Sequence, residues 1–169
     1  MTYPYTGISI DFIHQKIHDG EIFQRSLIDT SVNNATPKKY RLKTGTKDCH
    51  TRILIQADAA GKAQLFELST FSGGGTERTL YNKNRNSIKT PGAKLYEDPT
   101  STTDGTEIDS QRFGSNKGNV KLGGEIYNSD EWVLEHNTEH MIVFTPDGNG
   151  VSMIMTIDLY ETAEGRETG

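Results

Sequence analysis

The chain has 169 residues, a formal net charge of −5 and a hydrophobic content of 33%. A chain of this length can bury the core of one ordinary domain without covalent cross-links. Its single cysteine excludes an intrachain disulfide and a cysteine-based zinc site. The acidic balance argues against nucleic acid as a partner, and no apolar run reaches the roughly 18 residues that a membrane-spanning helix needs.

The first residues lack the basic and apolar regions of a secretory signal, so we expect a protein that folds in a reducing cytoplasm. Residues 1–6 are expected to form an N-terminal arm. Tyr3 and Tyr5 flank Pro4, whose ring fixes the backbone φ angle and keeps the arm extended. Two tyrosines on a stiff arm can bury apolar area on a neighbour. We therefore predict that Tyr3 and Tyr5 bind a partner.

A single β domain is expected over residues 7–160, because alternation of apolar and polar side chains with period two dominates this range. The clearest case is 151–160, where strict alternation holds for the whole segment. The strand candidates in chain order are 8–12, 21–31, 38–43, 52–57, 62–71, 88–97, 107–113, 120–126, 131–135, 138–145 and 151–160. The best helix candidate is the short segment 14–19.

Turn residues separate these segments. Residues 147–150 (DGNG) can supply the positive φ angles of a tight hairpin between the last two strands. Residues 81–87 are rich in asparagine and predict an irregular loop whose side chains bond to the backbone. Residues 98–106 are rich in Ser, Thr and Asp and predict a long loop. Residues 161–169 have no large apolar side chain, which predicts a flexible C-terminal tail.

About eight to ten antiparallel strands with many turns predict an all-β fold, which we interpret as a jelly-roll-like β-sandwich with short flexible termini. A single closed barrel is the second interpretation. Neither class requires more helix than the one short segment before the first long strand.

The histidines invite a search for a metal site, because His14 and His18, like His136 and His140, are four residues apart. On a helix this spacing places two imidazoles on one face. The motif HExxH is absent, however, and the second pair lies at an expected turn. We therefore predict no metal site and no cofactor, and we expect His14 and His18 to bond to backbone groups in a turn or to titrate at an interface.

Other catalytic patterns are weak. Cys49 and His50 are neighbours on an expected strand, so their side chains point to opposite faces and form no dyad. The acidic residues of the second half include candidates for glycoside hydrolysis, but the sequence cannot give the distance between two carboxylates. The Asp-rich turns match no calcium-loop pattern. No catalytic residue is predicted.

Four segments together resemble a family of small phage and prophage virion proteins encoded near capsid genes: 14–23, 39–47, 79–87 and 131–146. The family patterns are H-x-x-I-H-x-G-x-x-F, N-x-N-R-N-S and E-W-[IV]-L followed by N-T, and we call them the first, second and third motif. The matching residues are His14, Ile17, His18, Gly20 and Phe23 in the first, Asn82, Asn84, Arg85, Asn86 and Ser87 in the second, and Glu131, Trp132, Val133, Leu134, Asn137 and Thr138 in the third.

The resemblance implies a non-enzymatic virion protein, a capsid decoration or cement protein on the outer surface of the shell. Its implied partners are the major capsid protein and further copies of itself, as a dimer or trimer, with neither nucleic acid nor a membrane. The motif residues His14, His18, Gly20, Asn84, Arg85 and Asn86 are then structural. Trp132 is either an aromatic partner-binding residue or part of the core. The alternatives are a carbohydrate- or receptor-binding β-sandwich of a fibre or tail, and a cupin-like metal enzyme.

Overall fold

The computed structural model describes residues 12–114, 124–127 and 131–162, and in this part of the chain it is all-β with one short helix. The helix is α1 (Phe12–His18). The strands are β1 (Ile22–Val32), β2 (Lys38–Lys43), β3 (Asp48–Ala57), β4 (Gly61–Glu67), β5 (Thr70–Gly73), β6 (Thr76–Arg78), β7 (Tyr81–Asn82), β8 (Lys94–Glu97), β9 (Thr100–Thr103), β10 (Thr106–Phe113), β11 (Gly124–Tyr127), β12 (Trp132–Leu134), β13 (Glu139–Pro146) and β14 (Val151–Thr162).

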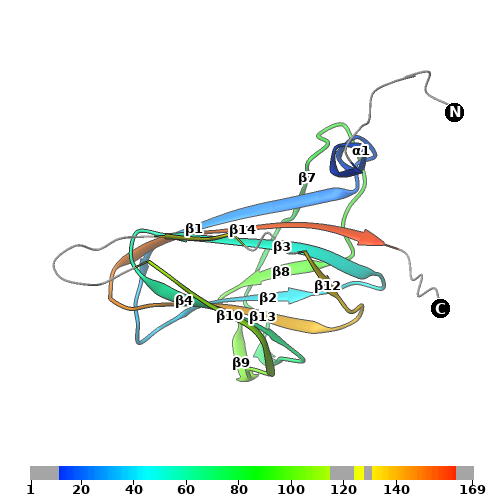
Figure 1. Ribbon diagram of the computed structural model, residues 1–169. Helices are drawn as coiled ribbons and strands as arrows, with labels where there is room; N and C mark the ends of the chain where they lie inside the picture. The colour runs from blue at the N-terminus through cyan, green and yellow to red at the C-terminus, as the bar shows by residue number, and fades with distance from the viewer. Residues whose placement is uncertain (1–11, 115–123, 128–130, 163–169) are drawn as a thin grey trace, which may run out of the picture.

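Two antiparallel sheets form a sandwich-like arrangement (Figure 1). The first, which we call the β14 sheet, has the strand order β11-β3-β14-β1-β7, and β12 also pairs with β3. The second, the β13 sheet, has the order β10-β4-β13-β2-β8-β6. Strands β1 to β4 alternate between the two sheets. The all-β, sandwich-like class predicted from the alternation is therefore confirmed.

The prediction of a hairpin at residues 147–150 is wrong. Strand β13 pairs with β2 and β4, whereas β14 pairs with β1 and β3, so the turn passes from one sheet to the other. Its backbone bonds to neighbouring loops instead, from Asp147 N to the carbonyl oxygen of Ala60 and from Asn34 N to that of Gly148. Gly150 does adopt the expected positive φ, of 70°.

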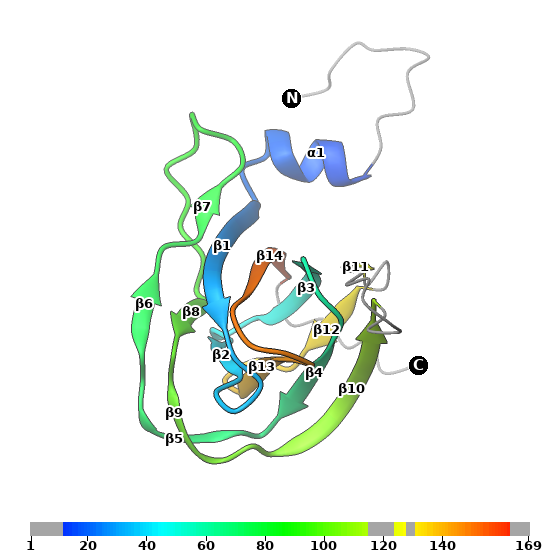
Figure 2. The same cartoon turned by 90° about the vertical axis from the view of Figure 1, so that its left-hand side faces the viewer.

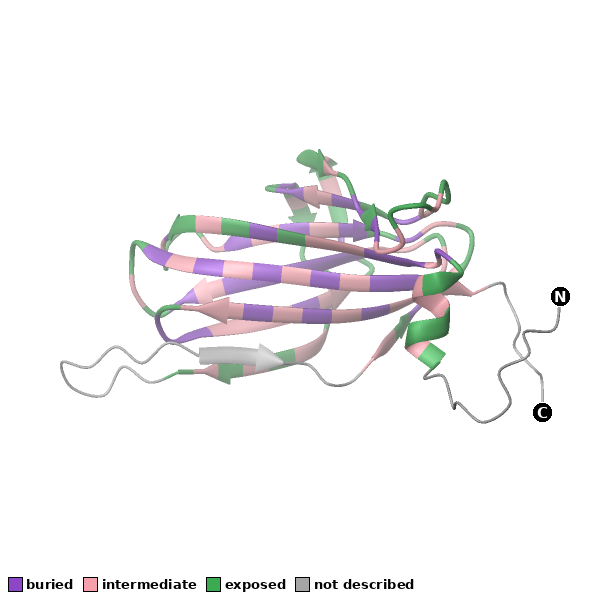
Figure 3. Ribbon diagram, turned by 90° about the horizontal axis from the view of Figure 1, so that it is seen from above, coloured by how far each residue is buried: buried purple, intermediate pink, exposed green. Residues whose placement is uncertain are grey.

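The core lies between the sheets, and β14 crosses its centre. Alternate β14 residues point inward and are at most 2% exposed. The residues between them are partly exposed, and Figure 3 shows this alternation of burial as bands along the strand. The inward residues are Val151, Met153, Met155, Ile157 and Leu159. They pack against fully buried side chains of the β13 sheet such as Tyr40 and Phe144.

A buried cation joins the two sheets at one side of the sandwich. Lys38 on β2 is 8% exposed, and its ammonium lies 2.8 Å from the carboxylate of Asp29 on β1, 2.7 Å from that of Glu97 on β8 and 3.0 Å from that of Asp98. Burial opposes the charge on Lys38, but the three carboxylates outweigh burial and raise its pKa. Lysine is thus charged inside this sandwich because its acidic partners come from both sheets.

The structure also differs from the sequence in its short elements. The described part has fourteen strands rather than eight to ten, because several run for only two to four residues. The expected strand 62–71 is divided at Leu68, which has a φ of 56°, and the expected loop 98–106 contains β9. Strand β14 continues through Thr162, two residues beyond the expected end of the domain.

Helix α1 begins at Phe12, where the sequence predicted a strand, and the rest of that strand lies outside the described residues. The helix lies at one end of the sandwich, above β1 and β14 (Figures 1 and 2). The long loop between β7 and β8, residues 83–93, lies beside it in Figure 2, and we call it the asparagine loop. Within the described ranges, no helix is both long and apolar enough to cross a membrane.

Candidate functional site

The turn after α1 packs onto the asparagine loop. Gly20 has a φ of 67°, which glycine adopts at low cost. Side-chain amides donate 2.8 Å hydrogen bonds to this turn, from Asn82 to the carbonyl oxygen of Gly20 and from Asn84 to that of His18. A Cβ atom at Gly20 would lie 2.5 Å from the Cβ of Ser87. These contacts bring the first motif and the second motif together.

The asparagine loop also forms hydrogen bonds within itself and with Asn82 at the end of β7. Asn82 Oδ1 accepts a hydrogen bond from the backbone N–H of Asn84, and Asn84 Oδ1 accepts one from that of Asn86. The hydroxyl of Ser87 accepts one from the N–H of Lys89. Side chains that bond to the backbone two residues ahead stabilise irregular chain without strand pairing. From Lys83 onward the segment is irregular, as its composition predicts, whereas Tyr81 and Asn82 of the expected loop form strand β7.

The carboxylate of Glu131, from the third motif, lies on the outer face of the β14 sheet. It accepts a hydrogen bond of 2.7 Å from the hydroxyl of Tyr160 and lies 2.6 Å from His50 Nδ1 and 3.5 Å from a terminal nitrogen of Arg52. The rings of His50 and Tyr160 are stacked with centroids 4.4 Å apart. Burial alone raises the pKa of Glu131, but the bonds from Tyr160 and His50 outweigh it, and the pKa is lowered.

Helix α1 covers this carboxylate cluster. The ring of Phe12 meets Tyr160 edge-on at 6.1 Å, and the ammonium of Lys16 lies 6.0 Å from the centre of the same ring. Ile13 helps to line a cavity of about 40 Å³ between the helix and the sheet, together with His50 and Glu131. All three motifs therefore meet at one end of the β14 sheet, which we call the helical end.

A concave surface of about 330 Å³ lies beside β7 at the same end. Tyr81 is 48% exposed there, and the guanidinium carbons of Arg25 and Arg85 lie 5.3 Å and 5.5 Å from its ring centre. Neither arginine forms an ion pair with a described carboxylate, and Arg25 Nε is buried without a hydrogen-bond partner among the described atoms. This Tyr81 groove thus offers two positive charges and an aromatic ring to a ligand.

Large apolar side chains are exposed around the helical end. Phe12 is 55% exposed and Val133, which lies opposite His50 on the outer face of the sheet, is 57% exposed. Ile88 in the asparagine loop is 98% exposed. Three of the exposed large apolar side chains of the described residues therefore lie on elements of the helical end, whereas Ile28 and Leu68, at 69% and 62% exposure, lie on other elements.

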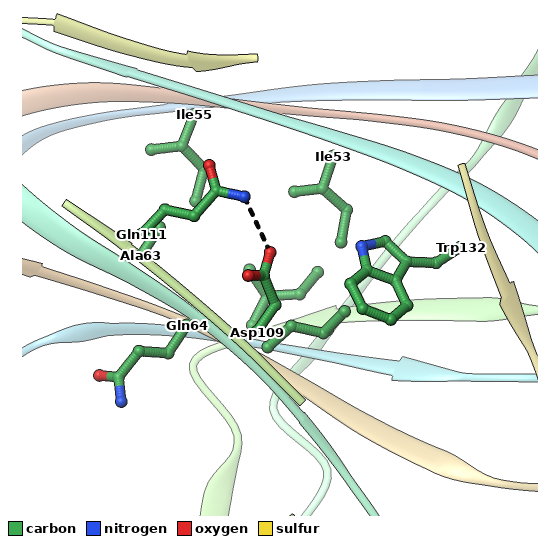
Figure 4. Close-up of a pocket in the computed structure, with 9 residues that line it drawn as sticks. Ile53, Ile55, Ala63, Gln64, Asp109, Gln111 and Trp132 are labelled. Atoms are coloured by element: carbon green, nitrogen blue, oxygen red, sulfur yellow. Dashed lines mark hydrogen bonds between the residues drawn. The ribbon is translucent and has the colours of Figure 1, made fainter. Parts of the chain in front are cut away.

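Trp132 points to the other side of the sheet, because its strand partner is the buried Thr51. It packs against the core and lines a cavity of about 30 Å³ at the open side of the sandwich. Figure 4 shows the indole on one side of this cavity and the hydrogen-bonded Gln111 and Asp109 on the other. The indole N–H has no hydrogen-bond partner among the described atoms. Trp132 is therefore half-buried and belongs partly to the core.

The structure places the other candidate groups as follows. Cys49 is fully buried, and burial raises its pKa to about 12, while His50 faces outward.

His14 and His18 lie on one exposed face of α1, and their Nε2 atoms are 3.0 Å apart. Among the described residues, these rings bond to each other and not to the backbone groups that the sequence suggested. Among the described residues, no group of three or more potential ligands could hold a metal ion.

The predicted residues are thus partly brought together. Asn84 donates a hydrogen bond to the carbonyl oxygen of His18, Gly20 accepts one from Asn82, and Arg85 contacts Tyr81. Tyr3 and Tyr5 lie outside the described residues. Sequence reasoning named Val133 only as part of the third motif and did not name Arg25. The outward position of Val133 could have been recognised from the alternation around Trp132 and Leu134.

Comparison with protein-family models, with curated proteins and with solved structures finds no match to this chain.

Proposed function

We propose that this protein is a non-enzymatic phage virion protein that decorates the capsid, where it binds the outer surface of the major capsid shell and stabilises it. Its partners are the major capsid protein and further copies of this chain. The observation that supports the proposal is the meeting of the three motifs at the helical end. There they build a surface bordered by exposed apolar side chains.

A surface of modest affinity is sufficient for this function, because a decoration protein binds many equivalent sites on a shell. Each contact can then be modest, since several copies or subunits add their affinities. Burying Phe12, Val133 and Ile88 against a partner would remove apolar area from water at about 25 cal/mol per Å². The carboxylate cluster beneath α1 holds the helix against the sheet through Tyr160 and Phe12. The helix is therefore already ordered before binding, which keeps the entropy cost of binding small.

The test is to mix the purified protein with heads that lack it and to count bound copies by electron microscopy. We expect Val133→Asp and Ile88→Asp each to reduce binding at least about tenfold, because each places a charge in an apolar contact. Leu68→Asp is the matched control, since Leu68 is 62% exposed in the turn between β4 and β5, away from α1 (Figure 2). Melting temperatures must stay near that of the wild type in all three. Unchanged binding in both test variants, or no binding by the wild type, would contradict the proposal.

The Tyr81 groove favours a second candidate function, the binding of an acidic carbohydrate by a fibre or tail module. An exposed aromatic ring can stack on a sugar, and arginine can bind a carboxylate or phosphate with two parallel hydrogen bonds. The groove has the volume of a small-ligand site.

A glycan array separates this function from capsid binding. We expect binding to uronic-acid or phosphorylated glycans that Tyr81→Ala and Arg85→Gln abolish, with Arg112→Gln as the control on β10 in the other sheet. An array without any acidic glycan bound by the wild type would reject the second function and leave the first intact.

A further inference from the structure

Helix α1 presents two imidazoles whose nitrogens converge. His14 Nε2 and His18 Nε2 are 3.0 Å apart, and the ring centres are 4.6 Å apart at an angle of 65°. Both side chains are exposed. Among the described residues, the contact between these two atoms is the one hydrogen bond that either ring forms. Two ligand atoms of the same kind therefore lie side by side at the surface.

The other described histidines are already engaged. His50 Nδ1 bonds to Glu131, His136 Nδ1 to Asp48 and His140 Nε2 to Thr138. Only the α1 pair combines exposure with two converging nitrogens. When the proton between the Nε2 atoms moves to Nδ1 of the ring that carries it, both Nε2 lone pairs can bind one metal ion. Neutral imidazole is the commonest metal ligand among side chains.

The distance between the nitrogens favours one coordination geometry. Two nitrogens 3.0 Å apart, each about 2.0–2.1 Å from one ion, subtend roughly 90–100° at that ion. This angle fits two neighbouring positions of a square-planar or octahedral ion, the geometry of Cu²⁺ and Ni²⁺. A tetrahedral Zn²⁺ site has an angle of about 109° and needs a separation of about 3.3–3.4 Å.

We propose that His14 and His18 form a two-histidine binding site for Cu²⁺ or Ni²⁺ on α1. Water fills the remaining positions of the ion, which leaves them open to a ligand atom from another molecule. The bound ion links His14 to His18, which lie one helical turn apart. Because α1 has seven residues and none is buried, this link restricts unwinding of a helix that is too short to be stable alone. The site does not depend on the proposed virion function.

The test is isothermal titration of the untagged full chain with CuCl₂ and NiCl₂ in a non-chelating buffer, with electron paramagnetic resonance of the copper form. We expect one ion per chain with two nitrogen donors. His14→Ala and His18→Ala should each weaken binding about tenfold or more, because each removes half of the chelate. Zn²⁺ should bind more weakly than Cu²⁺ and Ni²⁺.

A matched control keeps the number of histidines but changes their spacing. The double variant H18A/Q15H places two imidazoles at adjacent helix positions that face about 100° apart, so they cannot share an ion. It should bind as weakly as His18→Ala. Circular dichroism checks that every variant is folded. Equal binding by the wild type and His14→Ala, tight binding by the respaced variant, or a preference for Zn²⁺ would each overturn the proposal.

Discussion

The side-chain amide of Asn82 donates a hydrogen bond of 2.8 Å to the carbonyl oxygen of Gly20, across 62 residues of chain. Asn82 is 8% exposed, so water cannot readily replace this donor. The same amide lies 3.3 Å from the carbonyl oxygen of Lys89. One side chain therefore satisfies backbone acceptors of both segments that meet at the helical end.

We expect Asn82→Ala to lower the free energy of unfolding by about 1–3 kcal/mol, because it leaves a buried carbonyl without its partner. Urea denaturation followed by the fluorescence of Trp132 measures the change. Asn86→Ala in the adjoining asparagine loop is the control, since its exposed side chain forms no hydrogen bond with the described residues. Equal effects of both variants would show that the Asn82 bond contributes nothing specific.

Gly20→Ala should destabilise the protein by at least about 1–2 kcal/mol, because alanine is strained at the positive φ of this position and its Cβ would clash with Ser87. Gly148→Ala is the matched control. No described atom lies within 4 Å of a Cβ there, so we expect a change below about 0.5 kcal/mol. Thermal unfolding by circular dichroism compares the two, and a tolerated Gly20→Ala would contradict the tight approach of the loop.

Lys38→Met should cost about 3–5 kcal/mol, because it leaves the partly buried carboxylates of Asp29 and Glu97 without their cation. Lys43→Met on the same strand is the control. Lys43 is half exposed and lies 3.9 Å from Glu139, so its loss should change stability by less than about 1 kcal/mol. Similar midpoints in urea for the two variants would exclude an important role for the buried cation.

The same cluster predicts a pH dependence. The hydrogen bond from Lys38 lowers the pKa of Asp29. Burial raises the pKa of Glu97, but Lys38 and Arg78 outweigh it, and the pKa is lowered. A lowered folded-state pKa contributes stability above the ordinary carboxyl pKa of about 4, and that stability is lost as the pH falls. The wild type should therefore lose stability below about pH 4 more steeply than Lys38→Met, and parallel profiles would contradict this.

Deleting residues 2–6 tests the predicted arm. We expect weaker binding to heads or a smaller oligomer, because two tyrosine contacts of a few kcal/mol at most are lost, and an unchanged melting temperature. Light scattering and electron microscopy provide the measurements. A truncated protein with unchanged affinity and mass in solution would show that Tyr3 and Tyr5 bind no partner.

The long elements could be predicted from sequence because burial on one face imposes alternation. Strand β14 shows this over its whole length, and its inward side chains are the ones that the pattern selects. The two-residue strand β7 could not be predicted in this way, since a period of two needs several repeats to be visible. Its place beside β1 depends on contacts with Phe23 and Gln24 that are distant in sequence.

The prediction of a hairpin between β13 and β14 was wrong for a different reason. Residues with a low cost at positive φ reverse the chain equally well within a sheet and between two sheets. The choice depends on which neighbours each strand finds, and β13 finds β2 and β4. Likewise, the hydrogen bond from Asn84 to His18 could not be predicted from the sequence. Neither the first motif nor the second motif contains information about where the other lies in the fold.

The position of β14 has a consequence for synthesis. This strand follows the other described strands in the chain, yet it lies in the middle of its sheet between β1 and β3. While the chain is being made, β1 and β3 have no partner on their facing edges, and such open edges favour aggregation. The β14 sheet can therefore be completed only after residues 151–162 have left the ribosome, because β14 supplies the partner for both open edges.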